Sequence, residues 1–208
     1  MKKTILRLLI LTPLLMAFQC EEEEEEYNTI FTNEYKAALT VQPNFNIDDI
    51  IWIEGKVSSK GFDASANDSI FLENTVIEHF NIMKLQINQS NDVSNYINST
   101  GAIGDFVIVN DIGSHYFGVC EEASVVLISE LSADELFFTY RIGIKATIAG
   151  DYFVSFRKSI ILNIERNEDI FRPYQLTNNP MTIGFDLCGK SSVRRTNESD
   201  REFFFTVN

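Results

Sequence analysis

The side chains that could carry chemistry are few, and their spacing matches no catalytic motif. The two histidines, His79 and His115, form neither an H-x-x-x-H nor an H-E-x-x-H pair, the spacings that place two imidazoles on one helix face to bind zinc. The chain also lacks a G-x-S-x-G segment, in which a sharp turn exposes a nucleophilic serine. We therefore expect no metal centre, no catalytic residue and no cofactor.

Carboxylates are the other groups that could perform catalysis, and they occur as adjacent pairs. A glycoside hydrolase needs two carboxyl groups that face each other about 5–9 Å apart across the scissile bond. Nothing in the local pattern brings these acids to such an arrangement, so we interpret them as solvated surface residues. The pairs are Asp48 and Asp49, Glu121 and Glu122, and Asp134 and Glu135.

Two further features each have two interpretations. Arg194 and Arg195 are adjacent arginines in an acidic chain, and they could bind an anion. Alternatively they pair with nearby acids, for which the candidates are Glu198, Asp200 and Glu202. Trp52, the sole tryptophan, lies on the polar side of an alternating segment, where it could stack on a sugar ring or pack beneath other residues.

The first 26 residues indicate how the chain is exported and held. A basic start with Lys2 and Arg7 precedes an apolar run over residues 8–16, shorter than the roughly 20 apolar residues of a membrane-spanning helix. Cys20 follows, and Glu21–Glu26 form an unbroken acidic block. This order resembles the signal of bacterial lipoproteins. Its acidic block is similar to the surface-export signal of lipoproteins from the Bacteroidetes group.

The resemblance implies a signal peptide over residues 1–19, acylation of Cys20 and a lipid-anchored protein of the outer membrane on the cell surface. The periplasmic face is the alternative location. The standard cleavage motif prefers Leu three positions before the cysteine and a small residue directly before it, whereas this chain has Ala17 and Gln19. An ordinary cleaved signal and an uncleaved anchor are the other readings. The acidic block could also be a plain spacer, since adjacent glutamates repel each other and stay solvated.

Composition and export limit the partners and the cysteine chemistry. The formal net charge of −13 repels phosphate backbones, which excludes nucleic acid as an expected partner. We expect the lipid anchor to contact the membrane, and a protein or glycan of unknown identity to be the ligand. In an exported chain, Cys120 and Cys188 are a possible disulfide, worth roughly 4 kcal/mol in the chain-entropy model. Two buried free thiols are the alternative.

Apolar residues alternate with polar ones in many short segments, and this period of two predicts strands with one buried face. In the clearest case, every second residue from Leu136 to Ile144 is apolar. No long amphipathic helix is visible, so we predict an all-β, antiparallel β-sandwich. The other predicted inward sets are Ile51, Ile53 and Val57; Met83, Leu85 and Ile87; Tyr152, Val154 and Phe156; Ile160, Leu162 and Ile164; Ile183, Phe185 and Leu187; and Phe203, Phe205 and Val207.

Residues 149–154, Ala-Gly-Asp-Tyr-Phe-Val, resemble the corner before strand F of immunoglobulin-like domains, where a tyrosine hydroxyl bonds back to the backbone. The resemblance implies an immunoglobulin-like sandwich with Tyr152 pointing inward; another sandwich or a jelly roll is the alternative. Val154 occupies the position of a core cysteine in antibody domains, so that family's disulfide is absent. We divide the chain into a signal peptide (1–19), a lipidated cysteine with acidic tether (20–37) and one elaborated β-sandwich domain (38–208).

One short motif suggests a modification. Asp68-Ser69-Ile70 resembles the motif for O-glycosylation of exported proteins in the Bacteroidetes group, which makes Ser69 a possible glycosylation site. Taken together, these features predict a cell-envelope lipoprotein that acts as a non-enzymatic binding, adhesion or structural module. The alternative is a glycan-active enzyme or a carbohydrate-binding accessory protein built on the same sandwich.

Overall fold

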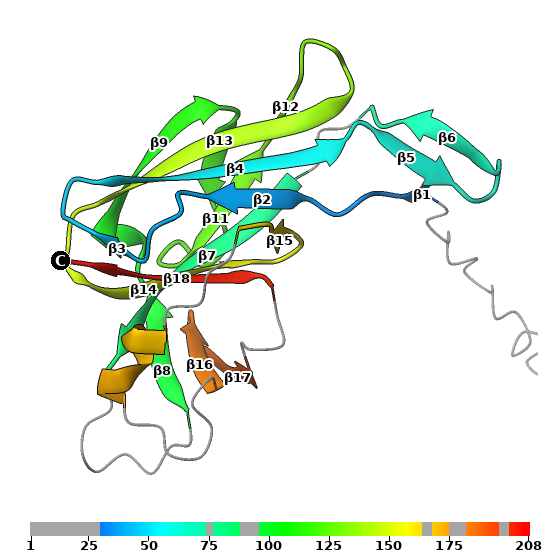
Figure 1. The fold of residues 1–208 in the computed structure, drawn as a ribbon. Coiled ribbons are helices and arrows are strands. Elements are labelled where there is room, and N and C mark those ends of the chain that lie inside the picture. Colours follow the sequence, from blue (N-terminus) through cyan, green and yellow to red (C-terminus); the bar gives the residue numbers. More distant parts are fainter. Residues whose placement is uncertain (1–29, 74–76, 88–95, 164–167, 175–181, 196–199) are drawn as a thin grey trace, which may run out of the picture.

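The computed structural model describes residues 30–73, 77–87, 96–163, 168–174, 182–195 and 200–208. Within these ranges the protein is all-β, and its helices are the short 3-10 turns η1 (Ile103–Asp105) and η2 (Glu168–Tyr174). Two large sheets pack face to face as a sandwich, and a small sheet projects from one end (Figure 1). The predicted all-β sandwich is confirmed.

The first large sheet, sheet I, runs in the order β12-β13-β4-β2-β15, and β9 pairs with the second half of β13. The second, sheet II, runs β17-β16-β8-β7-β14-β18-β3, and β11 pairs with the first half of β7 and with β10. The small sheet, which we call the arm, runs β1-β5-β6. Neighbouring strands are antiparallel except in three short pairs, β15 with β2, β16 with β8 and β18 with β3.

The strand bounds follow, sheet by sheet. Sheet I consists of β2 (Lys36–Leu39), β4 (Ile50–Ser58), β9 (Phe106–Ile112), β12 (Glu130–Leu131), β13 (Phe137–Ala146) and β15 (Ile160–Ile161). Sheet II consists of β3 (Asn44–Phe45), β7 (Ile77–Gln86), β8 (Ile97–Gly101), β10 (Ser114–Phe117), β11 (Ser124–Ile128), β14 (Gly150–Phe156), β16 (Thr182–Leu187), β17 (Lys190–Arg195) and β18 (Glu202–Val207). The arm consists of β1 (Ile30–Phe31), β5 (Lys60–Asp63) and β6 (Asp68–Phe71).

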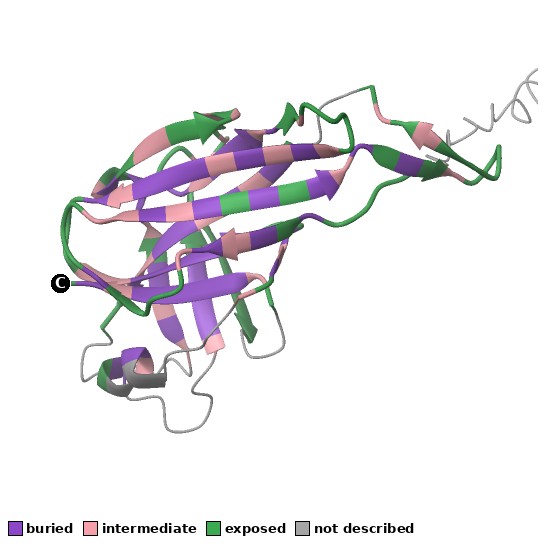
Figure 2. Cartoon of the chain, turned by 45° about the horizontal axis from the view of Figure 1, so that its top comes forward, coloured by how far each residue is buried: buried purple, intermediate pink, exposed green. Residues whose placement is uncertain are grey.

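The main core lies between sheets I and II, and alternation fixes which side chains enter it. On β4, Ile51 and Ile53 are fully buried while the residues between them are not (Figure 2). Sheet II supplies Val154 and Phe205 to the same cluster from the opposite side. Each such buried side chain contributes roughly 1.5–3 kcal/mol relative to exposure, and these contributions hold the two sheets together.

A second core, which the sequence pattern did not predict, lies on the other face of sheet II. Met83 of β7, Phe153 of β14 and Phe204 of β18 face away from the main core and pack with residues of β16 and η2, such as Ile183 and Ile170. Phe153 and Phe204 lie 5.1 Å apart between ring centroids, within the range of favourable aromatic pairs. This part of sheet II is therefore buried on both faces.

The corner before β14 has the geometry that its resemblance implies. Tyr152 is fully buried, and its hydroxyl lies 3.1 Å from the carbonyl oxygen of Ile148 and 2.7 Å from Oδ2 of Asp105. Gly150 precedes it with a φ of +154°, in the region that favours glycine. The arrangement is compatible with an immunoglobulin-like sandwich.

Four details of the strand prediction are wrong. Leu136, which the alternation places inward, is 52% exposed because β13 begins only at Phe137. The folded part begins before residue 38, because Tyr35 and Ala37 are already buried against sheet I. In β15 the inward residue is Ile161, which pairs with Ala37, whereas Leu162 is 62% exposed; two residues are too few for alternation to define a face. Ile87 is 67% exposed because β7 ends at Gln86. Ile164 lies outside the described residues.

Candidate functional site

The candidate site is a groove of about 660 Å³ on the outer face of sheet I, which we call the outer groove. It crosses β2, β4 and β13, and it is lined by the side chains that these strands direct away from the main core. Ile112 at the end of β9 and Leu162 after β15 border it with exposed apolar side chains. Its lining includes the charged, polar and aromatic residues Glu34, Lys36, Glu54, Lys56, Phe137, Thr139 and Arg141.

A close approach between β4 and β13 lies beneath the floor of the outer groove, on the core side of sheet I. Gly55 of β4 pairs with Tyr140 of β13, and the Tyr140 ring packs directly over the glycine. A Cβ atom at position 55 would lie 2.0 Å from Cζ of Tyr140, so no other residue fits there without displacing the ring. Gly55 is in phase with the buried residues Ile53 and Val57, so the ring fills space on the core side of sheet I, directly beneath the outer groove.

Arg141 organises the polar end of the outer groove. Its Nε donates to Oε1 of Glu54 at 2.8 Å, and its Nη1 donates to Oδ2 of Asp111 at 2.6 Å. The hydrogen bonds to Asp111 and Glu54 raise the pKa of Arg141 above its ordinary value. The guanidinium carbon also lies 3.9 Å from the centroid of the Trp52 ring. The arginine is thus fixed by two acids and one aromatic ring.

These contacts decide between the two interpretations of Trp52. The ring is half-buried on the outer face, next to Gly143, where a Cβ atom would lie 3.1 Å from its Cζ3. Arg141 covers a face of the ring, which is the surface that a sugar would need for stacking. Phe137 is covered in the same way, because Nζ of Lys56 lies 3.6 Å from its centroid. Neither ring is an open platform.

The two carboxylates that line the outer groove are both ion-paired. Glu54 is bound to Arg141, and Glu34 lies 3.7 Å from Nη2 of Arg201. Two of the adjacent acids of the sequence make contacts elsewhere: Asp48 pairs with Lys145 at 2.7 Å, and Asp134 accepts hydrogen bonds from the Ser132 hydroxyl and the Leu136 amide. The hydrogen bond from Ser132 is the main cause of the lowered pKa of Asp134.

Neither histidine lines the outer groove. His115 of β10 has Nδ1 2.6 Å from Oδ1 of Asn110, and burial lowers its pKa. His79 of β7 points to the outer face of sheet II, where burial and then the nearby charge of Arg157 lower its pKa. Among the described residues, no group of three His, Cys, Asp or Glu side chains could hold a metal ion.

Arg194 of β17 pairs with Glu202 of β18, one of the three acids that the sequence offered as partners. Glu202 is fully buried, so the arginine compensates a charge that would otherwise be costly to bury. Its guanidinium also lies 4.3 Å from the Phe185 ring centroid. This pairing accounts for Arg194 as a structural residue.

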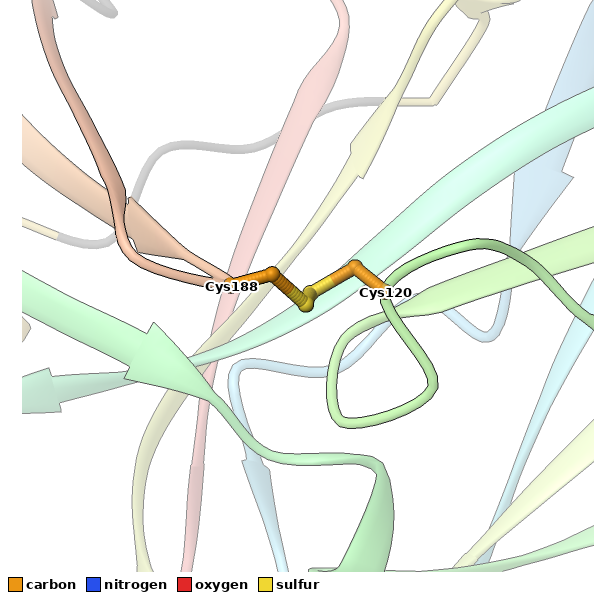
Figure 3. The surroundings of a disulfide bond; sticks show 2 residues. All are labelled: Cys120 and Cys188. Atoms are coloured by element: carbon orange, nitrogen blue, oxygen red, sulfur yellow. A yellow bond between two sulfur atoms is a disulfide. The ribbon is translucent and has the colours of Figure 1, made fainter.

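Cys120 and Cys188 are joined by a disulfide with an S–S distance of 2.07 Å (Figure 3). Cys188 and Gly189, with φ values of +50° and +74°, form the two-residue turn between β16 and β17. Cys120 precedes β11, so the bond ties this hairpin to the segment that leads into β11. Ser69 is exposed on β6, the edge strand of the arm; Cys20 and the glutamate block lie outside the described residues.

Sequence reasoning missed a polar cluster at one edge of the main core. Glu78 of β7 is fully buried; its Oε2 accepts from the Ser159 hydroxyl at 2.5 Å, and its Oε1 accepts from the amide of Lys158 at 3.2 Å. Nearby, the Tyr35 and Ser129 hydroxyls lie 2.9 Å apart, and burial raises the pKa of Tyr35 to about 12. Glu78 shares its strand face with the core residues Phe80 and Ile82, a signal visible only once the register is known.

No protein-family model, curated protein or solved structure matches this chain. Across the described residues, no helix has the length and apolar character needed to cross a membrane. Any statement about activity therefore depends on the chemistry of the surfaces described above.

Proposed function

We propose that the protein is a lipid-anchored, non-enzymatic binding module of the cell envelope, and that the outer groove binds an extended segment of another protein. The observation that supports this most is that cations cover two outward aromatic rings of sheet I: Lys56 lies over Phe137, which lines the groove, and the groove residue Arg141 lies over the neighbouring Trp52. Sugars are usually bound by stacking on uncovered aromatic faces together with a few fixed polar groups. The groove instead offers aliphatic side chains between fixed charges of both signs.

An extended peptide fits such a surface for two reasons. Its alternating side chains can place apolar groups on Leu162 and Ile112 and charged groups against Lys36 and Glu54. The charges of the groove are also already held in place, notably Arg141 between Glu54 and Asp111, so binding orders few side chains. Preorganised charges contribute specificity and association rate more than affinity.

The lipid anchor is the second part of the proposal, and it rests on the order of the first 26 residues. Each buried methylene contributes roughly 0.8 kcal/mol, and a single acyl chain holds only marginally, so two or three chains on Cys20 are needed for stable attachment. The cysteine lies ten positions before Ile30, the first residue of the arm, so the tether spans at most about 36 Å. The domain is thereby held close to the membrane.

The anchor is tested by mass spectrometry of the mature N-terminus. We expect an acylated Cys20, and we expect Cys20→Ser to release the protein from the membrane fraction. An unmodified N-terminus at another residue would remove this part of the proposal. Replacing Glu21–Glu26 with serines tests export: protease accessibility on intact cells falls if the block is an export signal and is unchanged if it is a spacer.

The outer groove is tested by probing a phage-displayed peptide library and a glycan array with the purified protein. We expect peptides to bind and to change the fluorescence of Trp52, the sole tryptophan. Thr139→Arg, which fills the groove floor beside Lys56, should weaken binding at least about tenfold. The matched control, Gln42→Arg, changes an exposed residue outside the groove and should bind normally.

The control arms separate the possible ligands. Glycan binding that Thr139→Arg abolishes would replace the protein ligand with a carbohydrate. If neither class of ligand shows dependence on Thr139, the outer groove is not a binding site.

A further inference from the structure

A second hollow, which we call the arginine pocket, lies on the outer face of sheet II. It has a volume of about 400 Å³ and is bounded by the β16–β17 hairpin and by strands β7, β11 and β14. Arg157, Arg194 and Arg201 line it together with His79, Asn81 and Ser192. This is the size range of sites for small organic molecules.

The lining of the arginine pocket has a charge opposite to that of the chain as a whole. Three of its lining residues are arginines and one is a histidine, while none of the described lining residues is an acid, in a protein of net charge −13. Hydroxyl and amide groups of Ser192 and Asn81 add further hydrogen-bond donors. A small cavity lined in this way favours anions and disfavours cations.

The three arginines are held in different ways, which leaves donors for a ligand. Arg194 balances the buried Glu202, and Arg201 donates to the carbonyl oxygen of Arg157 and lies near Glu34. Among the described residues, no carboxylate pairs with the exposed guanidinium of Arg157. The backbone amide of Arg157 donates to the carbonyl oxygen of His79 at 2.8 Å, which fixes the chain directly after β14.

The disulfide holds the β16–β17 hairpin, which bounds the arginine pocket. Cys188 lies in the turn of the β16–β17 hairpin, which carries Ser192 and Arg194, and Cys120 lies next to β11 (Figure 3). Without this bond, the hairpin would be held to sheet II by the short pairing of β16 with β8, by the second core and by the ion pair to Glu202. The bond therefore keeps the wall that carries Arg194 in place over β14.

We propose that the arginine pocket binds a small organic oxyanion, a molecule that carries a carboxylate, sulfate or phosphate group, with Arg157 and Arg194 as its cationic contacts. Guanidinium groups match the geometry of such oxyanions with two parallel N–H donors. The volume leaves room for a monosaccharide-sized remainder beside the anionic group. The arginine pocket lies on the opposite sheet from the outer groove, so this proposal and the proposed function succeed or fail separately.

The test is calorimetric titration of the full chain at low ionic strength with glucuronate, glucose 6-sulfate and glucose 6-phosphate. We expect at least one of them to bind at millimolar concentration or below, and neutral glucose to show no binding. Arg157→Gln should weaken binding about tenfold or more, because it removes a charge-assisted contact. Arg157 is exposed and its side chain is outside the ion pair to Glu202, so this variant keeps the fold.

Controls make the outcome decisive. Lys60→Gln removes an equal charge from the exposed surface of the arm and should bind like the parent. Titration with inorganic sulfate shows which part of the ligand is recognised. If sulfate binds as tightly as the sugar anions, the pocket recognises the oxyanion alone; if sulfate binds more weakly, the pocket also contacts the sugar. Both results support the proposal. The proposal is overturned if none of the anions binds, if glucose binds equally, or if Arg157→Gln leaves the affinity unchanged.

Discussion

Tyr152 offers the sharpest test of how the corner before β14 holds the sandwich together. Its ring is fully buried between Phe106 and Phe205, with centroid distances of 4.9 and 5.8 Å. Its hydroxyl lies 2.7 Å from Asp105, a carboxylate that also accepts from Lys84 at 3.0 Å. Burial, followed by the hydrogen bond to Asp105, raises the pKa of Tyr152 well above its ordinary value. The residue therefore joins a ring cluster to a polar network.

Two substitutions separate these contributions. Tyr152→Phe keeps the ring and removes a hydrogen bond to a charged group, worth about 1.5–3 kcal/mol; because Lys84 still pairs with Asp105, we expect the lower end of this range. Tyr152→Ala also empties a cavity in the main core and should cost about 3–5 kcal/mol. Both values are measured as changes in the free energy of unfolding by urea denaturation, with unchanged m-values.

Tyr116→Phe is the matched control, because Tyr116 is 48% exposed and the same change there should have little effect. If Tyr152→Ala were as stable as the parent, the ring would not support the core. If Tyr152→Phe cost nothing, the hydroxyl would not be a structural link, and the immunoglobulin-like reading of this corner would lose its physical basis.

Three further predictions follow from other contacts. Burial lowers the pKa of His79 in the folded state below its ordinary value of about 6.5, so the unfolded state binds the proton more readily. The free energy of unfolding should therefore fall as the pH drops below about 6.5. In urea melts across a pH series, His79→Gln should reduce this fall. Reducing the disulfide should lower the free energy of unfolding by about 4 kcal/mol, with Cys188→Ser giving the same loss without reductant. Arg141→Met removes the cation over Trp52 and should shift its fluorescence, whereas Lys145→Met should not.

The sandwich was predictable because most strands bury one face, and alternation then reports both the strand and its orientation. On β13, Tyr140, Ile142 and Ile144 are all buried as predicted. Alternation fails where a sheet is covered on both sides. Phe204 stands between the predicted inward residues Phe203 and Phe205, so alternation alone points it away from the main core, where it is buried in the second core. The uninterrupted run of phenylalanines around it was the available signal, since a doubly buried strand is apolar throughout.

The outer groove could not be predicted from the sequence for a different reason. Its residues were correctly placed on the outward face of β4 and β13, but their interactions depend on strand register. Arg141 lies opposite Glu54, and Gly143 lies opposite Trp52, only because β13 pairs with β4 in one alignment. A shift by one position would place each of these side chains on the other face. The local alternation of apolar and polar residues shows which face of a strand a side chain lies on. The pairing of distant strands decides which side chains are its neighbours.

The outer face of β7 explains why the two candidate sites differ in character. His79 and Asn81 line the arginine pocket, while Met83 and Leu85, further along the same face, belong to the second core. The layer formed by β16 and η2 covers the apolar half of this face and stops where the polar half begins. In sheet I no comparable layer is present among the described residues, so its outward side chains pair with each other across β4 and β13 instead. The partial cover over sheet II leaves a bounded cationic pocket beside it. Sheet I, whose outer face has no such cover among the described residues, presents an open groove with charges of both signs.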